Sequence, residues 1–404
     1  MSLSANRGSV VVKGFSISRL PRIEFGDGVL KKIPALAATL GNMALIVTGR
    51  SSFINSQSWH WLRSALKNAG IDYATCSIHD EPSPELIDEQ VRLLKDQNIN
   101  VVIAIGGGSV LDAAKAIAGL LPHGDSVMEY LEGVGPEKTY AGPPCPFIAV
   151  PTTAGTGSEA TKNAVLSRRG KNGFKKSFRD EQLVPDYAVV DPELLASCPP
   201  ELIAANGMDA LTQLMESYVS TRANRFTDTL ALDGLVAARE GLLPWYQNSN
   251  NREARSNMAY AALVSGITLA QCGLGSVHGL ASPLGAFFPI PHGVVCGTLV
   301  AACTQINIEA IRQREPDNPA LKKYARLGAL LNKRNYSNDS DALKELVDLL
   351  TSWTETMKLP KLSAYDIKET DFARIVANSR GSSMKTNPIV LTDEEIRGIL
   401  VSRL

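Results

Sequence analysis

Short apolar runs alternate with helical patterns throughout the first half of this chain. Residues 44–48 and 101–105 are compact apolar runs, as expected of strands that are covered on both faces. A further strand is expected at residues 73–78, and helical patterns occupy residues 59–69 and 84–97. This βαβαβ order predicts a parallel sheet with helices packed against both of its faces.

The character of the sequence changes near residue 194. Before this point, the remaining expected elements are a helix at residues 29–39 and strands at residues 10–12, 22–25, 147–150 and 187–190. After it, helical periodicity is found at residues 201–218, 226–242, 251–273, 294–312 and 342–357. Because 404 residues are many for one hydrophobic core, we expect two domains. These are an α/β domain over residues 1–193 and an all-α domain over residues 194–404.

Charge and composition argue against nucleic acid and membranes as binding partners. The 41 basic and 41 acidic residues cancel, so no basic surplus favours nucleic acid or an anionic membrane. No uninterrupted apolar run has transmembrane length, and the first residues lack the apolar segment of a signal peptide. The six cysteines form no CxxC pair, which fits a reducing compartment. We therefore expect a cytoplasmic protein that binds neither nucleic acid nor membrane.

A glycine-rich segment follows the strand expected at residues 101–105. It reads Gly106, Gly107, Gly108, Ser109 and opens a helical pattern. Glycine lets the backbone approach a ligand closely, and Ser109 is suited to cap the helix. The N–H groups and dipole of a helix N-terminus favour an anion such as a pyrophosphate. Taken alone, the segment is about as consistent with a simple chain reversal.

A second loop of glycine and hydroxyl residues follows the strand expected at residues 147–150. It contains Thr152, Thr153 and Thr156. Threonine hydroxyls are neutral donors to phosphate and ribose. The loop belongs at the carboxyl end of a strand, where open α/β sheets bind nucleotides. Two such loops on one sheet edge favour a nucleotide site over a polar loop that only caps a helix.

Two of the five histidines lie close together in the second half. His278 and His292 stand beside glycine and small apolar residues, a poor setting for a solvated histidine. Upstream, Asp209 and Gln213 are four residues apart and share one helix face. One carboxylate and two imidazoles could hold Fe²⁺ or Zn²⁺ as a Lewis acid. Each residue alone also fits a structural role, as a hydrogen-bonded core histidine or an aspartate near a helix N-terminus.

The linked set of segments resembles the iron-containing (group III) alcohol dehydrogenase family, whose fold is related to that of dehydroquinate synthase. The resemblance covers nearly the whole chain and rests on residues 106–109 with Asp112 and Lys115, and on residues 151–159, 190–192, 207–210, 277–285 and 291–293. It implies a dehydroquinate synthase-like fold with an α/β dinucleotide domain, an all-α domain and a cleft between them. There, hydride would pass between NAD or NADP and a small alcohol or aldehyde polarised by a divalent metal.

The resemblance also assigns roles to single residues. Asp209, His278 and His292 match metal ligands at the catalytic centre, and Gln213 stands at the fourth ligand position. Residues implied to contact the cofactor are Gly49, Gly106, Gly107, Gly108, Ser109, Asp112, Thr152, Thr153, Thr156 and Lys175. A homodimer is the default expectation for the assembly.

Three departures from the family pattern have consequences. The family usually has histidine in place of Gln213, and an amide oxygen is a weaker donor, so we expect weakened or altered metal binding. Many relatives have a proton-relaying histidine in place of Ser282, whose hydroxyl has no pKa near neutrality. Many NAD-preferring relatives have aspartate in place of Gly49. Its loss removes repulsion of a 2′-phosphate, which Arg50 and Ser51 could meet, so we expect NADP to be accepted.

Three alternative functions remain open from the sequence. One is a metal-independent reductase of the same fold, resembling maleylacetate reductases. Another is a nucleotide-binding protein with weakened catalysis, through Gln213 and Ser282. A lyase resembling dehydroquinate synthase is disfavoured, because residues 266–292 contain no arginine or lysine for an anionic substrate. Leu280, Phe287 and Phe288 suggest an apolar pocket wall but select no substrate. Every redox alternative requires the glycine loop and the histidines to face one cleft.

Overall fold

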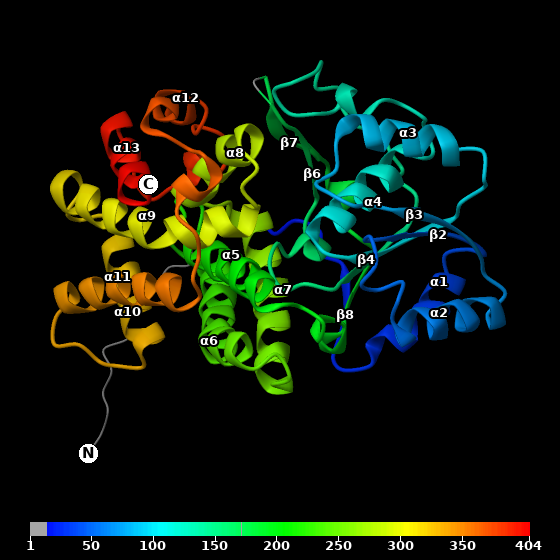
Figure 1. Ribbon diagram of the computed structural model, residues 1–404, viewed down its shortest axis with the longest axis horizontal. Coiled ribbons are helices and arrows are strands. Elements are labelled where there is room, and N and C mark those ends of the chain that lie inside the picture. The colour runs from blue at the N-terminus through cyan, green and yellow to red at the C-terminus, as the bar shows by residue number, and fades with distance from the viewer. Residues whose placement is uncertain (1–13, 171) are drawn as a thin grey trace.

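A six-stranded parallel sheet forms the centre of the first half of the molecule (Figure 1). The computed structural model describes residues 14–170 and 172–404, so the strand expected at residues 10–12 lies outside the described residues. The strand order is β1-β8-β5-β4-β2-β3. The strands are β1 (Arg22–Phe25), β2 (Met43–Thr48), β3 (Asp72–Ser77), β4 (Val101–Gly106), β5 (Phe147–Pro151) and β8 (Tyr187–Val190). All pairings among them are parallel, as the βαβαβ pattern predicts.

Helices cover both faces of this sheet, because its central strands are apolar on both sides. They are α1 (Ile33–Ala38), α2 (Gln57–Asn68), α3 (Pro84–Leu94) and α4 (Gly108–Leu120). Ile46 of β2 belongs to the core that includes α1 and α2, whereas Leu45 belongs to the core that includes α3 and α4. The alternation of side chains along a strand explains why neighbouring residues enter opposite cores.

The register of the sheet brings several strand ends to one edge. Thr48 of β2 pairs with Ser77 of β3 and with Ile105 of β4, and Ile105 pairs with Val150 of β5. The loops that follow these strands therefore emerge next to one another. This edge carries both of the glycine-containing loops that were expected to bind a nucleotide.

An antiparallel hairpin, β6 (Asn163–Arg168) and β7 (Phe174–Arg179), was not expected from the sequence. Leu166 and Phe178 bury one side of it against the core of α3 and α4. Its tip reaches the second half of the molecule, where the N–H of Gly170 donates to the carbonyl of Ala286 at 3.3 Å. The hairpin lies between the sheet and helix α8 (Ser276–Phe287) in Figure 1.

The second half is helical, as expected. Its other helices are α5 (Pro200–Val219), α6 (Arg225–Gln247), α7 (Arg252–Cys272), α9 (His292–Arg314), α10 (Ala320–Asn332), α11 (Asp339–Thr356), α12 (Phe372–Ala377) and α13 (Asp393–Ser402). The five predicted helical stretches correspond to α5, α6, α7, α9 and α11, while α8, α10, α12 and α13 were not assigned. Short 3₁₀ helices occupy Val29–Lys32, Val127–Glu129, Ser158–Ala160, Glu181–Leu183, Pro192–Leu195, Leu362–Tyr365, Glu369–Asp371 and Met384–Thr386.

Helix α5 is the central element of this half. Almost every side chain from Ile203 to Val219 is buried, because α6, α7 and α9 pack around it. Helix α9 is long and apolar enough to cross a membrane, and α7 with α8 passes the same test only as a pair bent by 99°. However, 78% of the apolar window of α9 is buried inside the protein. Contacts between helices therefore account for its apolar composition.

Candidate active site

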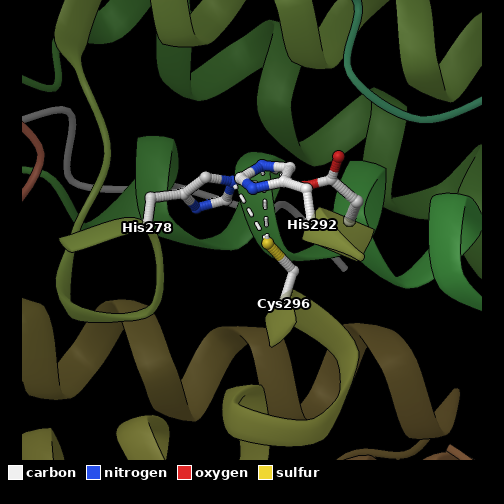
Figure 2. Close-up of side chains that lie close together, drawn as sticks. His278, His292 and Cys296 are labelled. Carbon is white, nitrogen blue, oxygen red and sulfur yellow. Dashed lines mark hydrogen bonds and ion pairs between the residues drawn. The ribbon is translucent and has the colours of Figure 1, made fainter. Parts of the chain in front are cut away.

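Three helices bring four potential metal ligands together. Asp209 comes from α5, His278 from α8, and His292 and Cys296 from the first turns of α9. The ligand atoms of these four residues lie within 4.8 Å of one another. Figure 2 shows both imidazoles and the Cys296 sulfur converging on one point. The sequence prediction that Asp209, His278 and His292 lie close together is met by this arrangement.

The orientation of His278 is set by a second carboxylate. Its Nδ1 lies 2.7 Å from Glu216 Oε2, and its Nε2 lies 3.1 Å from Asp209 Oδ1. Because a carboxylate accepts, Nδ1 donates its proton to Glu216 and Nε2 points into the cluster. Glu216 is itself held by the backbone N–H of Val277, at 2.7 Å. Such outer carboxylates are a common means of orienting a metal-binding histidine.

The pKa values of the cluster reflect burial and the close contacts among its groups. Burial opposes ionisation of Asp209, but the His292 and His278 imidazoles lower its pKa to about 2. Burial also opposes protonation of His278, but contacts with Cys296, Asp209 and Glu216 raise the pKa of His278 well above its usual value. Burial lowers the pKa of His292 to about 4, in the direction of the neutral ring that binds a metal.

Two buried atoms of the cluster lack hydrogen-bond partners within the described part of the chain. They are Asp209 Oδ2 and His292 Nδ1. Most buried polar atoms in folded proteins are paired, so the unpaired oxygen leaves the Asp209 carboxylate able to take a further partner. Oxygen, nitrogen and sulfur donors from this set suit a divalent transition metal. The residues present therefore fit the metal that the family resemblance implies.

Gln213 is hydrogen bonded at both ends of its amide. Its Nε2 donates to Asp209 Oδ1 at 3.2 Å, and its Oε1 accepts from the Ser265 hydroxyl at 2.8 Å. In this orientation the amide nitrogen, which cannot bind a metal, faces the cluster. The assignment of Gln213 as a ligand therefore remains a prediction that this geometry does not favour.

The glycine loop forms the N-terminus of α4. The helix begins at Gly108 with Gly107 at the N-cap, and no side chain caps it. The prediction that Ser109 caps this helix is therefore wrong, because Ser109 already lies inside the first turn. The loop is close-packed, since a Cβ atom on Gly108 would lie 2.8 Å from the Thr156 side chain. The uncapped N–H groups of the first turn suit an anion.

A buried lysine joins α4 to the loop after β5. Lys115 Nζ donates to the Ser158 carbonyl at 2.8 Å and to the Asn163 carbonyl at 2.8 Å. The Ser158 hydroxyl in turn donates to Asp112 at 2.6 Å. Burial lowers the pKa of Lys115 to about 8 and raises the pKa of Asp112. These bonds fix the second polar loop against the first.

One cavity of about 600 Å³ connects the glycine loop with the histidine cluster. Of the predicted site residues it is lined by Gly49, Gly107, Gly108, Ser109, Asp112, Thr153, Thr156, Lys175, Asp209, Gln213, His278 and His292. Gly106 and Thr152 do not line it. They lie behind the loops, where the Thr152 N–H donates to the Gly106 carbonyl at 2.9 Å. The glycine loop and the histidine cluster therefore face a single cavity, as a nicotinamide enzyme requires.

The unexpected hairpin supplies one wall of this cavity. Lys175 of β7 forms an ion pair with Glu81 at 2.7 Å. Burial acts to raise the pKa of Glu81, but Lys175 outweighs it and lowers that pKa. Ser282, in place of the relay histidine, donates its hydroxyl to the Lys175 carbonyl at 3.2 Å. The backbone of β7 is thus tied to α8 beside the cluster.

Sequence reasoning missed three residues of the site. Cys296 stands four residues after His292 and Glu216 seven after Asp209, so helical spacing alone places each pair on one face. Glu81 follows the strand at residues 73–78 and so lies at the same sheet edge as the glycine loop. The spacing of these residues is visible in the sequence. Their part in the site follows only when the neighbouring helices and strands are known.

Comparisons with known proteins agree with this fold and site. The sequence profile of iron-containing alcohol dehydrogenases matches residues 21–192, and that of the Fe-containing alcohol dehydrogenase family C-terminal domain matches residues 203–404. The crystal structure of 1,3-propanediol oxidoreductase superposes with a TM-score of 0.88 at 26% identity, over 97% of this chain and 100% of that one. The chain belongs to the iron-containing alcohol dehydrogenase family and is an oxidoreductase of that family.

Curated relatives cover almost the full length. Alcohol dehydrogenase 4 of Saccharomyces cerevisiae (strain YJM789) is 33% identical over 96% of this chain and 98% of its own length. The NADPH-dependent butanol dehydrogenase of Clostridium saccharobutylicum is 31% identical over 87% of both chains. The NAD-dependent methanol dehydrogenase of Bacillus methanolicus is 30% identical over 95% of this chain and 98% of its own. One of these relatives is named for NADPH and another for NAD.

Proposed function

We propose that this enzyme transfers hydride between NAD(P) and a small alcohol or aldehyde in the cavity between its two halves. The observation that carries the proposal is the single cavity lined by both the α4 N-terminus and the cluster of Asp209, His278 and His292. A cofactor with its pyrophosphate at Gly107 and Gly108 would extend its nicotinamide along the cavity towards the cluster. The relatives named for alcohol substrates support this substrate class.

Each group of residues has a proposed role. Gly107, Gly108 and Ser109 would receive the pyrophosphate through backbone N–H groups. Thr153 and Thr156 would lie along the cofactor, and Lys175 near its ribose. A divalent cation held by Asp209, His278 and His292 would act as a Lewis acid toward the substrate oxygen. The enclosing helices would keep water from the reacting atoms.

We propose that NADP is accepted and preferred. An aspartate side chain at position 49 would oppose a 2′-phosphate, and Gly49 offers none. Gly49 and Arg50 both line the cavity at the end of β2. The hydroxyl of Ser77, from the neighbouring strand, donates to the Gly49 carbonyl at 3.3 Å, and His79 lies 3.2 Å from that hydroxyl. Arg50 and His79 would supply positive or donor groups for the phosphate.

The test is oxidation of NADPH and NADH with a panel of short aliphatic and aromatic aldehydes. We expect turnover with at least one aldehyde and a lower KM for NADPH. His292→Ala should lower kcat by at least about 100-fold, as loss of one transition-state contact commonly does. His60→Ala, on the exposed face of α2, is the matched control and should leave kcat unchanged. Nucleotide binding without turnover of any aldehyde would instead favour the non-catalytic alternative.

A metal-independent reductase is the second candidate. The observation that favours it is the orientation of Gln213, whose amide nitrogen donates to Asp209 while its oxygen accepts from Ser265. Dialysis against a chelator separates the candidates. Activity that persists with no bound metal supports this second function, whereas loss and recovery on adding Zn²⁺ or Fe²⁺ supports the first.

We also propose that the enzyme works in the cytoplasm as a homodimer. All six cysteines are free and buried, which suits a reducing compartment. Closed two-fold dimers are the commonest soluble assembly. Sedimentation analysis of the purified chain tests the dimer, and a monomer at micromolar concentration would contradict it.

A further inference from the structure

Cys296 belongs to the cluster, but the family resemblance gives it no role. It is fully buried and stands one helical turn after His292 on α9. Its sulfur lies 3.6 Å from His278 Nε2 and 3.8 Å from His292 Nε2. Figure 2 shows the sulfur pointing at both rings. The thiol therefore contacts both imidazole nitrogens that face the cluster.

These spacings match a tetrahedral metal site. With zinc bonds of about 2.0–2.1 Å to nitrogen and oxygen and about 2.3 Å to sulfur, tetrahedral angles give N···O edges of about 3.4 Å and N···S edges of about 3.6 Å. The two N···O distances, from His278 and His292 to Asp209 Oδ1, are 3.1 and 3.7 Å. The two N···S distances are 3.6 and 3.8 Å. These four of the six edges lie within about 0.3 Å of the tetrahedral values, and all ligand atoms lie within 4.8 Å of one another.

Gln213 stands at the family's fourth ligand position, but both ends of its amide are already hydrogen bonded. Its amide is held between Asp209 and Ser265. The Ser265 hydroxyl also lies 2.7 Å from the Ala262 carbonyl, so its one proton has two possible acceptors. With no cation between them, reversing the amide would direct the Gln213 oxygen at Asp209 Oδ1, and two acceptors would then face each other. The observed orientation makes Gln213 a donor that positions Asp209.

We infer that Cys296 is the fourth protein ligand of the metal in this enzyme, in place of Gln213, and that Gln213 only positions Asp209. This inference rests on the proposed metal-dependent function. On loading, a sulfur–metal bond forms while the thiol S–H bond breaks, and the proton leaves to solvent with no change of oxidation state. A thiolate is a softer donor than an imidazole or amide, so the set should prefer Zn²⁺ over Fe²⁺.

Cobalt substitution tests the inference without an activity assay. The protein is stripped of metal, loaded with Co²⁺, and its near-ultraviolet absorption is recorded. Thiolate ligation produces a sulfur-to-cobalt charge-transfer band, which imidazole, carboxylate and amide ligands do not. We expect this band in the wild type and its loss in Cys296→Ser. Cys303→Ser, a buried cysteine on the same helix, is the matched control and should retain the band.

A second variant separates the two candidate ligands. Gln213→Leu removes the amide, so the band should persist and Zn²⁺ affinity should fall by about 10–100-fold, as for loss of an outer-shell contact. Cys296→Ser should lower Zn²⁺ affinity by more than Gln213→Leu does, as measured against a chelating indicator. Circular dichroism confirms that each variant is folded.

The outcomes are distinguishable from failure of the proposed function. A band that is absent in the wild type, or that survives in Cys296→Ser, overturns the inference even if the enzyme reduces aldehydes with metal bound. A wild-type protein that binds neither Co²⁺ nor Zn²⁺ overturns both the inference and the metal-dependent function. Aldehyde reduction that fails while the band is present overturns the proposed function alone.

Discussion

Glu216 accepts the Nδ1 proton of His278 at 2.7 Å, and this bond determines which nitrogen of the ring faces Asp209. The two carboxylates lie seven residues apart on α5, on the same face of that helix. A single helix therefore supplies both a proposed metal ligand, Asp209, and the group that orients His278 on another helix. The position of His278 depends on α5 as much as on α8.

Replacing Glu216 by glutamine should disturb the metal site while leaving the volume of the side chain unchanged. The new amide must place its NH₂ against either His278 Nδ1–H or the Val277 N–H, both of which donate to Glu216. Moving the ring proton to Nε2 would relieve the first clash but remove the ligand lone pair. We expect metal affinity to fall about 10–100-fold. Glu309→Gln, an exposed position on α9, is the control, and equal affinities would contradict the prediction.

Gly49→Asp should shift cofactor preference from NADPH towards NADH. The substitution is sterically open, because the nearest atom to a Cβ at this position is Val110 Cγ2 at 3.8 Å. The carboxylate would repel a 2′-phosphate, so we expect the ratio of kcat/KM values for NADPH and NADH to fall at least about tenfold, or about 1.4 kcal/mol. Gly49→Ala adds the Cβ without charge and should leave the ratio within about twofold of wild type.

Gly108→Ala should be far more damaging than Gly107→Ala. A Cβ on Gly108 would lie 2.8 Å from both the oxygen and the methyl group of Thr156, whereas one on Gly107 would lie 3.4 Å from Thr153. We expect Gly108→Ala to lower the free energy of unfolding by about 1–3 kcal/mol and to weaken nucleotide binding. Adding Thr156→Ala removes both clashing atoms and should restore the stability in a urea titration. A Gly108→Ala protein as stable as wild type would refute the clash.

Glu159 should make stability depend on pH. Burial raises the pKa of its carboxyl to about 7, from an ordinary value of 4.5. Between these values the folded state binds more protons than the unfolded state, so stability falls as pH rises. Relative to Glu159→Gln, the wild type should lose about 3 kcal/mol of unfolding free energy as the pH rises from about 4 to about 8, with little change above that range. Parallel urea titrations of both proteins across this range test the sign.

Much of the fold could be predicted because periodicity and strand order are local signals. The sheet, its helices and α5, α6, α7, α9 and α11 follow from such patterns. The β6–β7 hairpin did not, since both strands end in arginine and β7 is interrupted by two lysines, of which Lys175 lines the cavity. The usual alternation of apolar and polar residues does not identify a strand whose polar side chains line a cavity.

The candidate site could be predicted only in part, for a related reason. Family resemblance located Asp209, His278 and His292, and the structure brings them together. Nothing distinguishes Cys296 from the other five cysteines in the sequence, because a sequence does not show which face of α9 is turned towards α5. The same limit applies to Gln213, whose amide orientation depends on Ser265, a residue 52 positions away in the chain.

The hairpin tip has a mechanical consequence for the cavity. Gly170 donates to Ala286 of α8 and accepts from Arg374 of α12 at 3.4 Å, while Lys175 on the same hairpin receives the hydroxyl of Ser282. The hairpin, which packs in the first half, is therefore hydrogen bonded to α8 and α12 of the second half. Any movement that separated the hairpin from α8 and α12 would have to break these three hydrogen bonds.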